Sequence, residues 1–222
     1  MKVIETYIDN CLQFAEENQE YLMYVPFGEE KVEPEMFNPI DINIFSNKPD
    51  RIFIIQKDRT DFFIHKGTAK DMFWKPVENN ISEEEINNLE KQLNIIFPVP
   101  YKEYLKYKHY YEVFWDLNVV LYAKPQNAWK QILINKNQNT KEIILDKGYF
   151  AIGKYSDYGE IALKLGSEET DELEIVMFDY ETGEVGEKLA ENFTDFLEQI
   201  LKIDKPNFRE LKEFEKKMGI YK

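Results

Sequence analysis

The 222-residue sequence is long enough to bury a core, either as one large domain or as a domain carrying an extension. Its 43% hydrophobic and 15% aromatic residues are typical of a folded protein, and its net charge of −14 argues against nucleic acid or anionic lipid as a partner. The single cysteine, Cys11, excludes an internal disulfide and a thiolate metal cluster.

The beginning of the sequence carries no pattern typical of export. The run MKVIETYIDN places Glu5 and Asp9 before any apolar stretch of signal-peptide length, and no later stretch reaches the length of a membrane span. We therefore expect a cytoplasmic location and no membrane partner.

The first 73 residues predict a helix followed by a β-hairpin. Apolar residues recur at roughly helical spacing over residues 2–20, and Cys11 falls among them, which suits helix packing. After a connection containing several prolines, two strand-like runs at 51–56 and 61–65 are joined by a polar turn. We expect residues 1–73 to form an extension that is either separate from the main core or part of it.

A clear helix start lies at ISEEEI, residues 81–86. Ser82 and Glu85 form a capping-box pattern, in which each side chain bonds the backbone N–H of the other residue. The run FPVP, residues 97–100, ends this helix, and its last proline suits the first turn of a second helix over 101–107.

From residue 117 onward the pattern is mainly that of strands. The expected strands span, in chain order, 117–122, 149–154, 160–165, 173–179 and roughly 185–189, with a short helix or turn within 125–135. Turns are expected at 157–159 and 181–183. We interpret Gly153, Gly159 and Gly183 as structural turn glycines, because glycine adopts positive φ angles at little cost.

A capped helix is expected to close the core. Asn192 precedes an apolar stripe over 193–201, and its side chain can accept a hydrogen bond from the backbone of Asp195. Residues 203–222 repeat the amphipathic pattern and predict a C-terminal helix. Together these elements predict an α+β fold, in which helices pack on an antiparallel or mixed β-sheet and the main domain spans 74–202.

The negative charge is concentrated in one part of the chain. Residues 157–198 contain fourteen acidic and two basic residues, whereas the remaining chain is nearly balanced. This acidic segment is either a solvated face that keeps the protein soluble or a docking surface for a basic partner.

Recognisable catalytic and metal-binding motifs are missing from the sequence. The glycines around residue 153 follow neither a dinucleotide-binding nor a P-loop pattern, and His65 and His109 lie in no catalytic or zinc-ligand context. Four carboxylates near predicted strand ends are candidates for a Mg²⁺ site or an acid–base pair: Asp157, Glu160, Asp179 and Glu181. Because such clustering is expected in so acidic a segment, we expect no enzyme activity, no bound metal and no cofactor.

Exposed aromatic residues would matter most in a protein that acts by binding, because they supply much of the energy of protein interfaces. The candidates are Trp74, Trp115, Trp129, Tyr155, Tyr158 and Tyr180. Most of the tryptophans are expected in the core. Tyr158 and Tyr180 adjoin turns of the acidic segment, where we expect exposure.

Four features occur in order along residues 81–201. They are the capped helix with Ile86 and Leu89, the aromatic helix YKEYL at 101–105, the hairpin from Phe150 to Gly159, and an ending with Asp179, Gly183-Glu184 and the helix residues 192–197. In this order and spacing the features resemble the SUKH superfamily, the Smi/Knr-type domain found in many bacterial toxin-immunity proteins and in yeast cell-wall regulators. That family often has a glycine-containing turn after the aromatic helix, where this chain reads YKHYY at 107–111.

The resemblance implies an immunity protein that binds and neutralises a cognate toxin. The acidic segment favours a basic toxin, such as a nuclease with a basic substrate groove. The residues expected to contact it are Asp157, Tyr158, Glu160, Asp179, Tyr180, Glu181 and Glu184, with the acids steering association and the tyrosines anchoring the complex. An adaptor or regulator that binds a host protein is the alternative, and a metal-dependent hydrolase that uses the acidic cluster is a third hypothesis. The sequence leaves the oligomeric state open.

Overall fold

The computed structural model describes residues 2–17, 36, 75–111, 113–116, 118–169 and 173–205, together with two short strands at 53–55 and 62–64. The helices are α1 (Lys2–Glu17), α4 (Glu83–Leu93), α5 (Val99–Leu105), α6 (Trp129–Asn139) and α7 (Phe193–Ile200), with a 3-10 turn, η3 (Leu145–Lys147). The strands are β1 (Phe53–Ile55), β2 (Phe62–Ile64), β3 (Val113–Phe114), β4 (Val119–Leu121), β5 (Tyr149–Tyr155), β6 (Gly159–Lys164), β7 (Ile175–Asp179) and β8 (Val185–Ala190).

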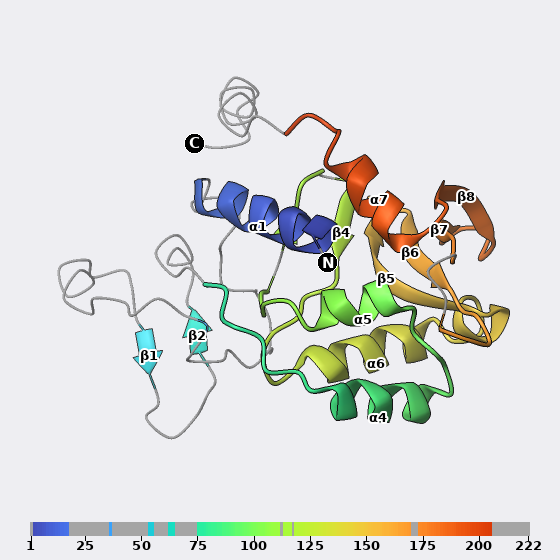
Figure 1. Ribbon diagram of the computed structural model, residues 1–222, viewed down its shortest axis with the longest axis horizontal. Coiled ribbons are helices and arrows are strands. Elements are labelled where there is room, and N and C mark those ends of the chain that lie inside the picture. Colours follow the sequence, from blue (N-terminus) through green and yellow to red (C-terminus); the bar gives the residue numbers. More distant parts are fainter. Residues whose placement is uncertain are drawn as a thin grey trace.

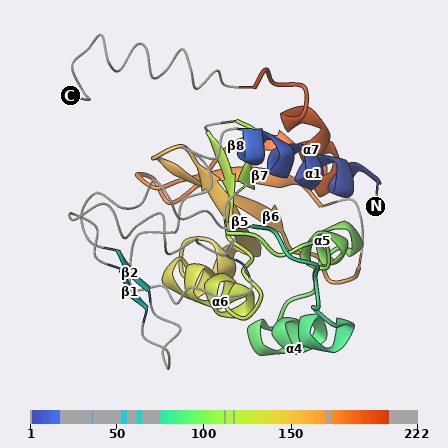
Figure 2. The ribbon, with the colours of Figure 1, turned by 90° about the vertical axis from the view of Figure 1, so that its left-hand side faces the viewer.

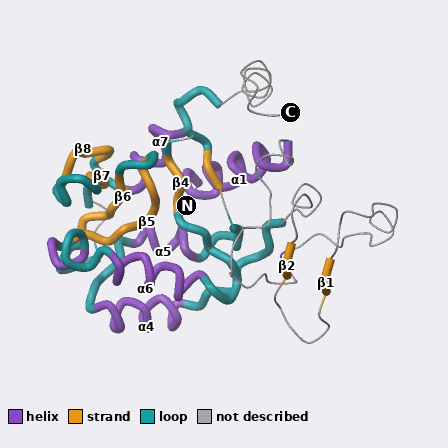
Figure 3. The backbone as a smooth tube through the Cα atoms, turned by 180° about the vertical axis from the view of Figure 1, so that it is seen from behind, coloured by secondary structure: helices purple, strands orange, loops and turns teal. Residues whose placement is uncertain are grey.

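The fold is α+β and is built around one six-stranded antiparallel sheet. Its strand order, β3-β4-β5-β6-β7-β8, follows the sequence, so each strand pairs with the next one along the chain. Helices α1 and α7 lie on one side of the strands and α4 and α6 on the other, with α5 between them (Figures 1 and 2). Seen from behind, strands β5 to β8 gather at one end of the molecule (Figure 3). The α+β prediction is confirmed, and the sheet is purely antiparallel.

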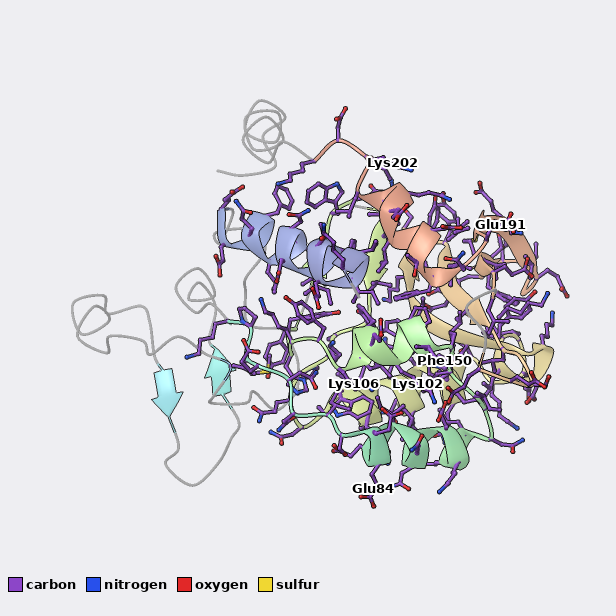
Figure 4. The ribbon with its side chains drawn as sticks, viewed as in Figure 1. Glu84, Lys102, Lys106, Phe150, Glu191 and Lys202 are labelled. Atoms are coloured by element: carbon purple, nitrogen blue, oxygen red, sulfur yellow. The ribbon has the colours of Figure 1, made fainter. Side chains whose placement is uncertain are left out.

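Aromatic rings join the helices to the sheet. Phe193 of α7 packs edge-on against Tyr101 and Tyr104 of α5, with ring centroids 5.4 and 5.3 Å apart. Phe97, at the proline-rich break, packs in the same way at 4.9 Å against Phe150 of β5, which Figure 4 labels beside α5. Edge-to-face pairs of this kind add packing energy to the burial of apolar area. The proline-rich break and α5 are therefore joined by aromatic rings to β5 and α7, while α1, α6 and α7 also pack on strands.

Helix α1 belongs to the same hydrophobic core. It contacts α5, α7 and β3, and its residues Tyr7, Ile8 and Cys11 are fully buried. Burial raises the pKa of the Cys11 thiol to about 12, so this cysteine is an inert packing residue, as its helical spacing predicts.

The other elements expected near the chain ends differ in how far the structure describes them. Residues 18–20 of the expected first helix, Trp74 and most of the expected helix 203–222 lie outside the described residues. The predicted hairpin is confirmed, because β1 and β2 pair antiparallel.

The capping box at the start of α4 forms as predicted. Ser82 Oγ accepts a hydrogen bond from the Glu85 backbone N–H at 3.2 Å, and Glu85 Oε2 accepts one from the Ser82 backbone N–H at 2.8 Å. The helix ends where Asn94 adopts a left-handed backbone with φ 54°. Helix α5 then runs over Val99–Leu105, two residues earlier than expected at each end.

Helix α6 is longer than the short helix or turn expected within 125–135. Its buried residue Asn137 attaches the helix to β5. Asn137 donates from Nδ2 to the Ala151 carbonyl at 2.9 Å and accepts from the Ala151 N–H at 2.7 Å. Strand β4 pairs only with the second half of β5, from Gly153 onward. Asn137 thus replaces the missing strand pairing beside Ala151, which satisfies a backbone segment that would otherwise be a bare edge.

Two of the three predicted turn glycines have a different role. Gly153 lies inside β5, where a Cβ would come within 2.6 Å of the Val120 carbonyl oxygen, and Gly159 begins β6. The positive φ near the first turn belongs to Ser156, at 55°. Gly153 and Gly159 are needed for close approach between strands, whereas Gly183 adopts φ 66° in its turn, as predicted.

Candidate functional site

The two turns of the acidic segment lie side by side at one end of the sheet. Gly159 pairs with Asp179 in the β6–β7 register, and the Tyr180 backbone N–H donates to the Tyr158 carbonyl at 2.9 Å. We call the surface formed by residues 155–159 and 179–185 the sheet tip. It brings together six of the seven residues predicted to bind a partner: Asp157, Tyr158, Asp179, Tyr180, Glu181 and Glu184.

The β7–β8 turn is fixed by Asp179. Its Oδ1 accepts hydrogen bonds from the backbone N–H groups of Glu181, at 2.8 Å, and Thr182, at 2.9 Å. These bonds, that from Thr182 foremost, hold the pKa of Asp179 below its usual value. The Gly183 N–H donates to the Asp179 carbonyl at 2.9 Å and completes the turn. Asp179 therefore shapes the tip, and its carboxylate is engaged by the backbone.

Apolar and aromatic side chains are exposed at the tip. Tyr158 is 52% exposed, Tyr180 42% and Val185 44%. Ile143 is 37% exposed and lies against the turn, because a Cβ on Gly183 would come within 3.4 Å of its Cγ2. Four of the six large hydrophobic residues that are exposed in the described part of the chain thus gather here. Exposed aromatic side chains close to polar residues are typical of an interaction surface.

Acidic side chains are exposed at the tip as well. Asp157, Glu181 and Glu184 are exposed, and Lys147 Nζ forms an ion pair with Glu184 Oε1 at 2.7 Å. Val185 and Ile143 were absent from the predicted set. Val185 follows the predicted turn directly and could have been included, whereas Ile143 is brought to the tip by tertiary packing that has no local signal.

Glu160 differs from its expected place on the binding surface. Glu160 lies in β6, as predicted, but its side chain is buried, at 4% exposure. Its carboxylate accepts hydrogen bonds from the hydroxyl groups of Tyr122 and, at 2.8 Å, Tyr180. Glu160 is therefore a structural residue beneath the tip and presents no charge to solvent.

The acidic segment does not form a single surface. Glu169 forms an ion pair with Lys102 of α5 at 2.6 Å, and Glu174 forms one with Lys164 at 2.9 Å, at the opposite ends of β6 and β7 from the tip. Figure 4 labels Lys102 on α5. In the ranges that the structure describes, no group of three or more His, Cys, Asp or Glu side chains is placed to hold a metal ion.

The aromatic and histidine candidates outside the tip are structural. Trp115 and Trp129 are buried, as expected for core residues. His109 is also buried, with Nδ1 3.1 Å from the Lys124 carbonyl oxygen and Nε2 2.9 Å from Asn80 Oδ1. His65 lies outside the described residues.

A comparison with known protein families identifies the family of this chain. The family model described as SMI1-KNR4 cell-wall (SUKH_6) matches residues 83–197. The chain belongs to the SUKH superfamily. The matched SUKH region begins with α4, ends within α7 and contains all six strands of the large sheet, so it includes the sheet tip. No curated protein matches the chain.

Two features of this SUKH chain go beyond the matched pattern. Helix α1 precedes the matched region yet is buried in its core. Lys108 adopts a positive φ of 43° in the YKHYY run, at the place where the sequence departs from the glycine-containing turn often found in the family. Among the helices that the structure describes, none combines the length and the apolar character needed to cross a membrane.

We predict that His109 makes the stability of this SUKH chain depend on mildly acidic pH. Burial, the main cause, lowers the pKa of His109 to about 4, compared with 6.5 in an unfolded chain. Between pH 6.5 and 4 the unfolded chain therefore binds a proton that the folded chain does not. The free energy of unfolding should fall by about 2 kcal/mol through this one group as pH falls across that window.

Urea denaturation at several pH values between 7.5 and 4.5 measures this dependence. The control is His109→Gln, which cannot titrate and should show a shallower loss of stability on acidification, whatever its stability at pH 7.5. Parallel pH dependences for the two proteins would contradict the assignment to His109.

Proposed function

We propose that this SUKH chain is an immunity protein that binds a cognate toxin in the cytoplasm and neutralises it by occupying its active site or substrate groove, without catalysis of its own. The observation that carries the proposal is the sheet tip. Two exposed tyrosines, Tyr158 and Tyr180, lie on turns tied together by a backbone hydrogen bond, within a border of exposed carboxylates. Aromatic centres inside a polar rim are typical of protein-binding surfaces.

The chemistry of the tip favours a basic partner. Asp157, Glu181 and Glu184 carry negative charge at the surface, and the chain as a whole has a net charge of −14. A toxin that acts on nucleic acid needs a basic groove for its substrate, and an acidic protein can occupy such a groove. We therefore propose a nuclease toxin as the partner class.

An adaptor that recognises a host protein is the second candidate. It is favoured by the description of the matching family, which refers to the cell wall. Both candidates use the tip as a docking surface, and they differ in the partner that docks there.

Charge reversal at the tip tests the proposal. We predict that the double variant Glu181→Lys, Glu184→Lys slows association with the toxin about tenfold at low salt and flattens the salt dependence of the rate, because long-range steering is lost. The probe is the toxin-like C-terminal domain of any large protein whose gene adjoins the gene for this chain. Stopped-flow mixing gives the association rate, calorimetry gives the stoichiometry, and an assay of toxin activity shows neutralisation.

A matched control separates local charge from net charge. The double variant Glu16→Lys, Glu84→Lys changes the net charge by the same amount on the exposed surfaces of α1 and α4, where Figure 4 labels Glu84. It should leave association nearly as fast as in the native protein. Equal slowing by both double variants would show that net charge acts without a docking surface at the tip, and tight binding unaffected by either would place the docking surface elsewhere.

A further inference from the structure

A buried carboxylate lies directly beneath the exposed tyrosine of the tip. Glu160, on β6, is bonded from two directions: Tyr122 donates its hydroxyl from the end of β4, and Tyr180 donates its hydroxyl from the end of β7, at 2.8 Å. Strand β5 separates β4 from β6, so the Tyr122 side chain must extend across β5 to reach this carboxylate. The three side chains thus connect β4, β6 and β7 across β5 at the base of the tip.

Burying the Glu160 carboxylate costs free energy, and packing alone gives no reason for it. Burying a carboxylate is unfavourable unless hydrogen bonds or an opposite charge compensate for lost water. Glu160 is 4% exposed, and within the described ranges it forms no ion pair, so the two hydroxyl groups are the compensation that the structure shows. An apolar residue at this position of β6 would avoid the cost, which points to a use for the carboxylate.

The role of the Glu160 carboxylate can be inferred from Tyr180, whose hydroxyl group and ring lie in different environments. Its hydroxyl is held by Glu160, while 42% of the residue is exposed to solvent. Burial, followed by the hydrogen bond to the Glu160 carboxylate, raises the pKa of Tyr180. A phenol held at its far end cannot change rotamer without breaking a hydrogen bond to a charged group, so the ring stays in one orientation in the free protein.

Tyr158 provides the contrast. It is the more exposed of the two tyrosines, and its ring meets Tyr155 edge-on with centroids 5.8 Å apart. Its hydroxyl has no hydrogen-bond partner among the residues that the structure describes. Tyr158 is therefore positioned by ring packing alone.

We infer that Glu160 is a positioning residue for partner binding, which holds the Tyr180 ring in its binding orientation before the partner arrives. The inference rests on the proposed function, because it assigns Tyr180 as an anchor for the toxin. Ordering a free side chain at an interface reduces affinity, and an anchor that is already ordered avoids this loss. Positioning should act on the lifetime of the complex, whereas the charge of the buried carboxylate is too well shielded from solvent to steer association.

The decisive variant is Tyr180→Phe, which keeps the ring and removes only the bond to Glu160. Against the toxin-like C-terminal domain described above, we expect the dissociation rate to rise about three- to tenfold with the association rate unchanged. Tyr107→Phe removes a comparable hydroxyl bond outside the tip, from Tyr107 to the Asp9 carboxylate at 2.9 Å, and should leave both rates unchanged. Glu160→Gln should retain near-native dissociation, since its amide can accept from Tyr180 and donate to Tyr122.

Three outcomes would overturn the inference. They are an unchanged dissociation rate for Tyr180→Phe, an equal rise for Tyr107→Phe, or a slowed association for Glu160→Gln, which would mean that Glu160 acts through its charge.

A measurement on the free protein separates this inference from the proposed function. NMR of tyrosine-labelled protein should show one rotamer for Tyr180 in the native chain, and titration should show its raised phenol pKa falling in Glu160→Gln. If the native protein fails to bind the toxin domain but shows this behaviour, the proposed partner is wrong and the positioning of Tyr180 stands. Rotamer averaging of Tyr180 in the native free protein would overturn the positioning role, whether or not the toxin binds.

Discussion

Replacing both Tyr158 and Tyr180 with alanine is expected to weaken toxin binding about a hundredfold, or roughly 3 kcal/mol. Each substitution removes an exposed aromatic ring from the centre of the sheet tip, and truncation of a tyrosine anchor typically costs more than 1 kcal/mol. Titration calorimetry against the same toxin domain, at one fixed salt concentration, measures the loss.

Two exposed apolar residues elsewhere provide the matched control. Val99 and Ile203 are 41% and 44% exposed, close to the values for the two tyrosines, and neither belongs to the tip. The double variant Val99→Ala, Ile203→Ala should bind as the native protein does. If the tyrosine variant keeps native affinity, or if both double variants lose affinity equally, the tip is not the docking surface.

Lys124→Met is expected to have the largest effect on folding, with a loss of about 3 kcal/mol in the free energy of unfolding. The Lys124 side chain is buried and its ammonium group donates to three carbonyl oxygens at the end of α5: those of Tyr104, at 2.5 Å, Leu105, at 3.2 Å, and Tyr107, at 2.5 Å. Methionine preserves the length of the side chain but has no donor, so each oxygen loses its bond to the ammonium group, although the Tyr104 oxygen keeps one from the Tyr107 N–H and the Leu105 oxygen one from Asn79 Nδ2. Urea denaturation followed by circular dichroism measures the loss.

Lys106 is the control for Lys124 because it adjoins the same helix. Its side chain is 39% exposed and forms an ion pair with Glu83 at 2.5 Å. Since exposed ion pairs contribute little, Lys106→Met should cost less than about 1 kcal/mol. Similar small losses in both variants would show that water replaces the Lys124 ammonium group at the end of α5.

The environment of Lys124 also explains a shift in its titration. Burial lowers its pKa well below the usual value for lysine, and no carboxylate compensates among its contacts described above. The ammonium group is instead accommodated by carbonyl oxygens at the negative end of a helix and by the rings of Tyr104 and Tyr110, whose centroids lie 4.8 and 5.2 Å away.

Local signals in the sequence predicted most of the architecture. The capping box at Ser82, the proline break before α5 and the strand-like runs of β5 to β8 each depend on residues close together in the chain, and each appears in the structure. The tip was predictable for the same reason, since Tyr158 and Tyr180 adjoin turns that the sequence marks with glycine.

Buried polar residues could not be predicted in the same way. Glu160 was expected on the binding surface, and no local pattern in the sequence marks Asn137 or Lys124 as buried; each of the three is buried and bonded to a distant part of the chain. The partner of Glu160 on β4, Tyr122, is 38 residues away. Periodicity reports which side chains are apolar, but only tertiary pairing shows which polar groups are satisfied inside.

Neighbouring residues of the β7–β8 turn have different roles. Asp179 and Gly183 maintain the backbone, through hydrogen bonds to main-chain groups and a positive φ angle, whereas the side chains of Glu181 and Glu184 extend from that backbone into solvent. Substitutions at the outward positions change the surface without refolding the turn beneath it. Under the proposed function, point mutations at these outward positions can therefore change which toxin is bound while the turn that presents them keeps its conformation.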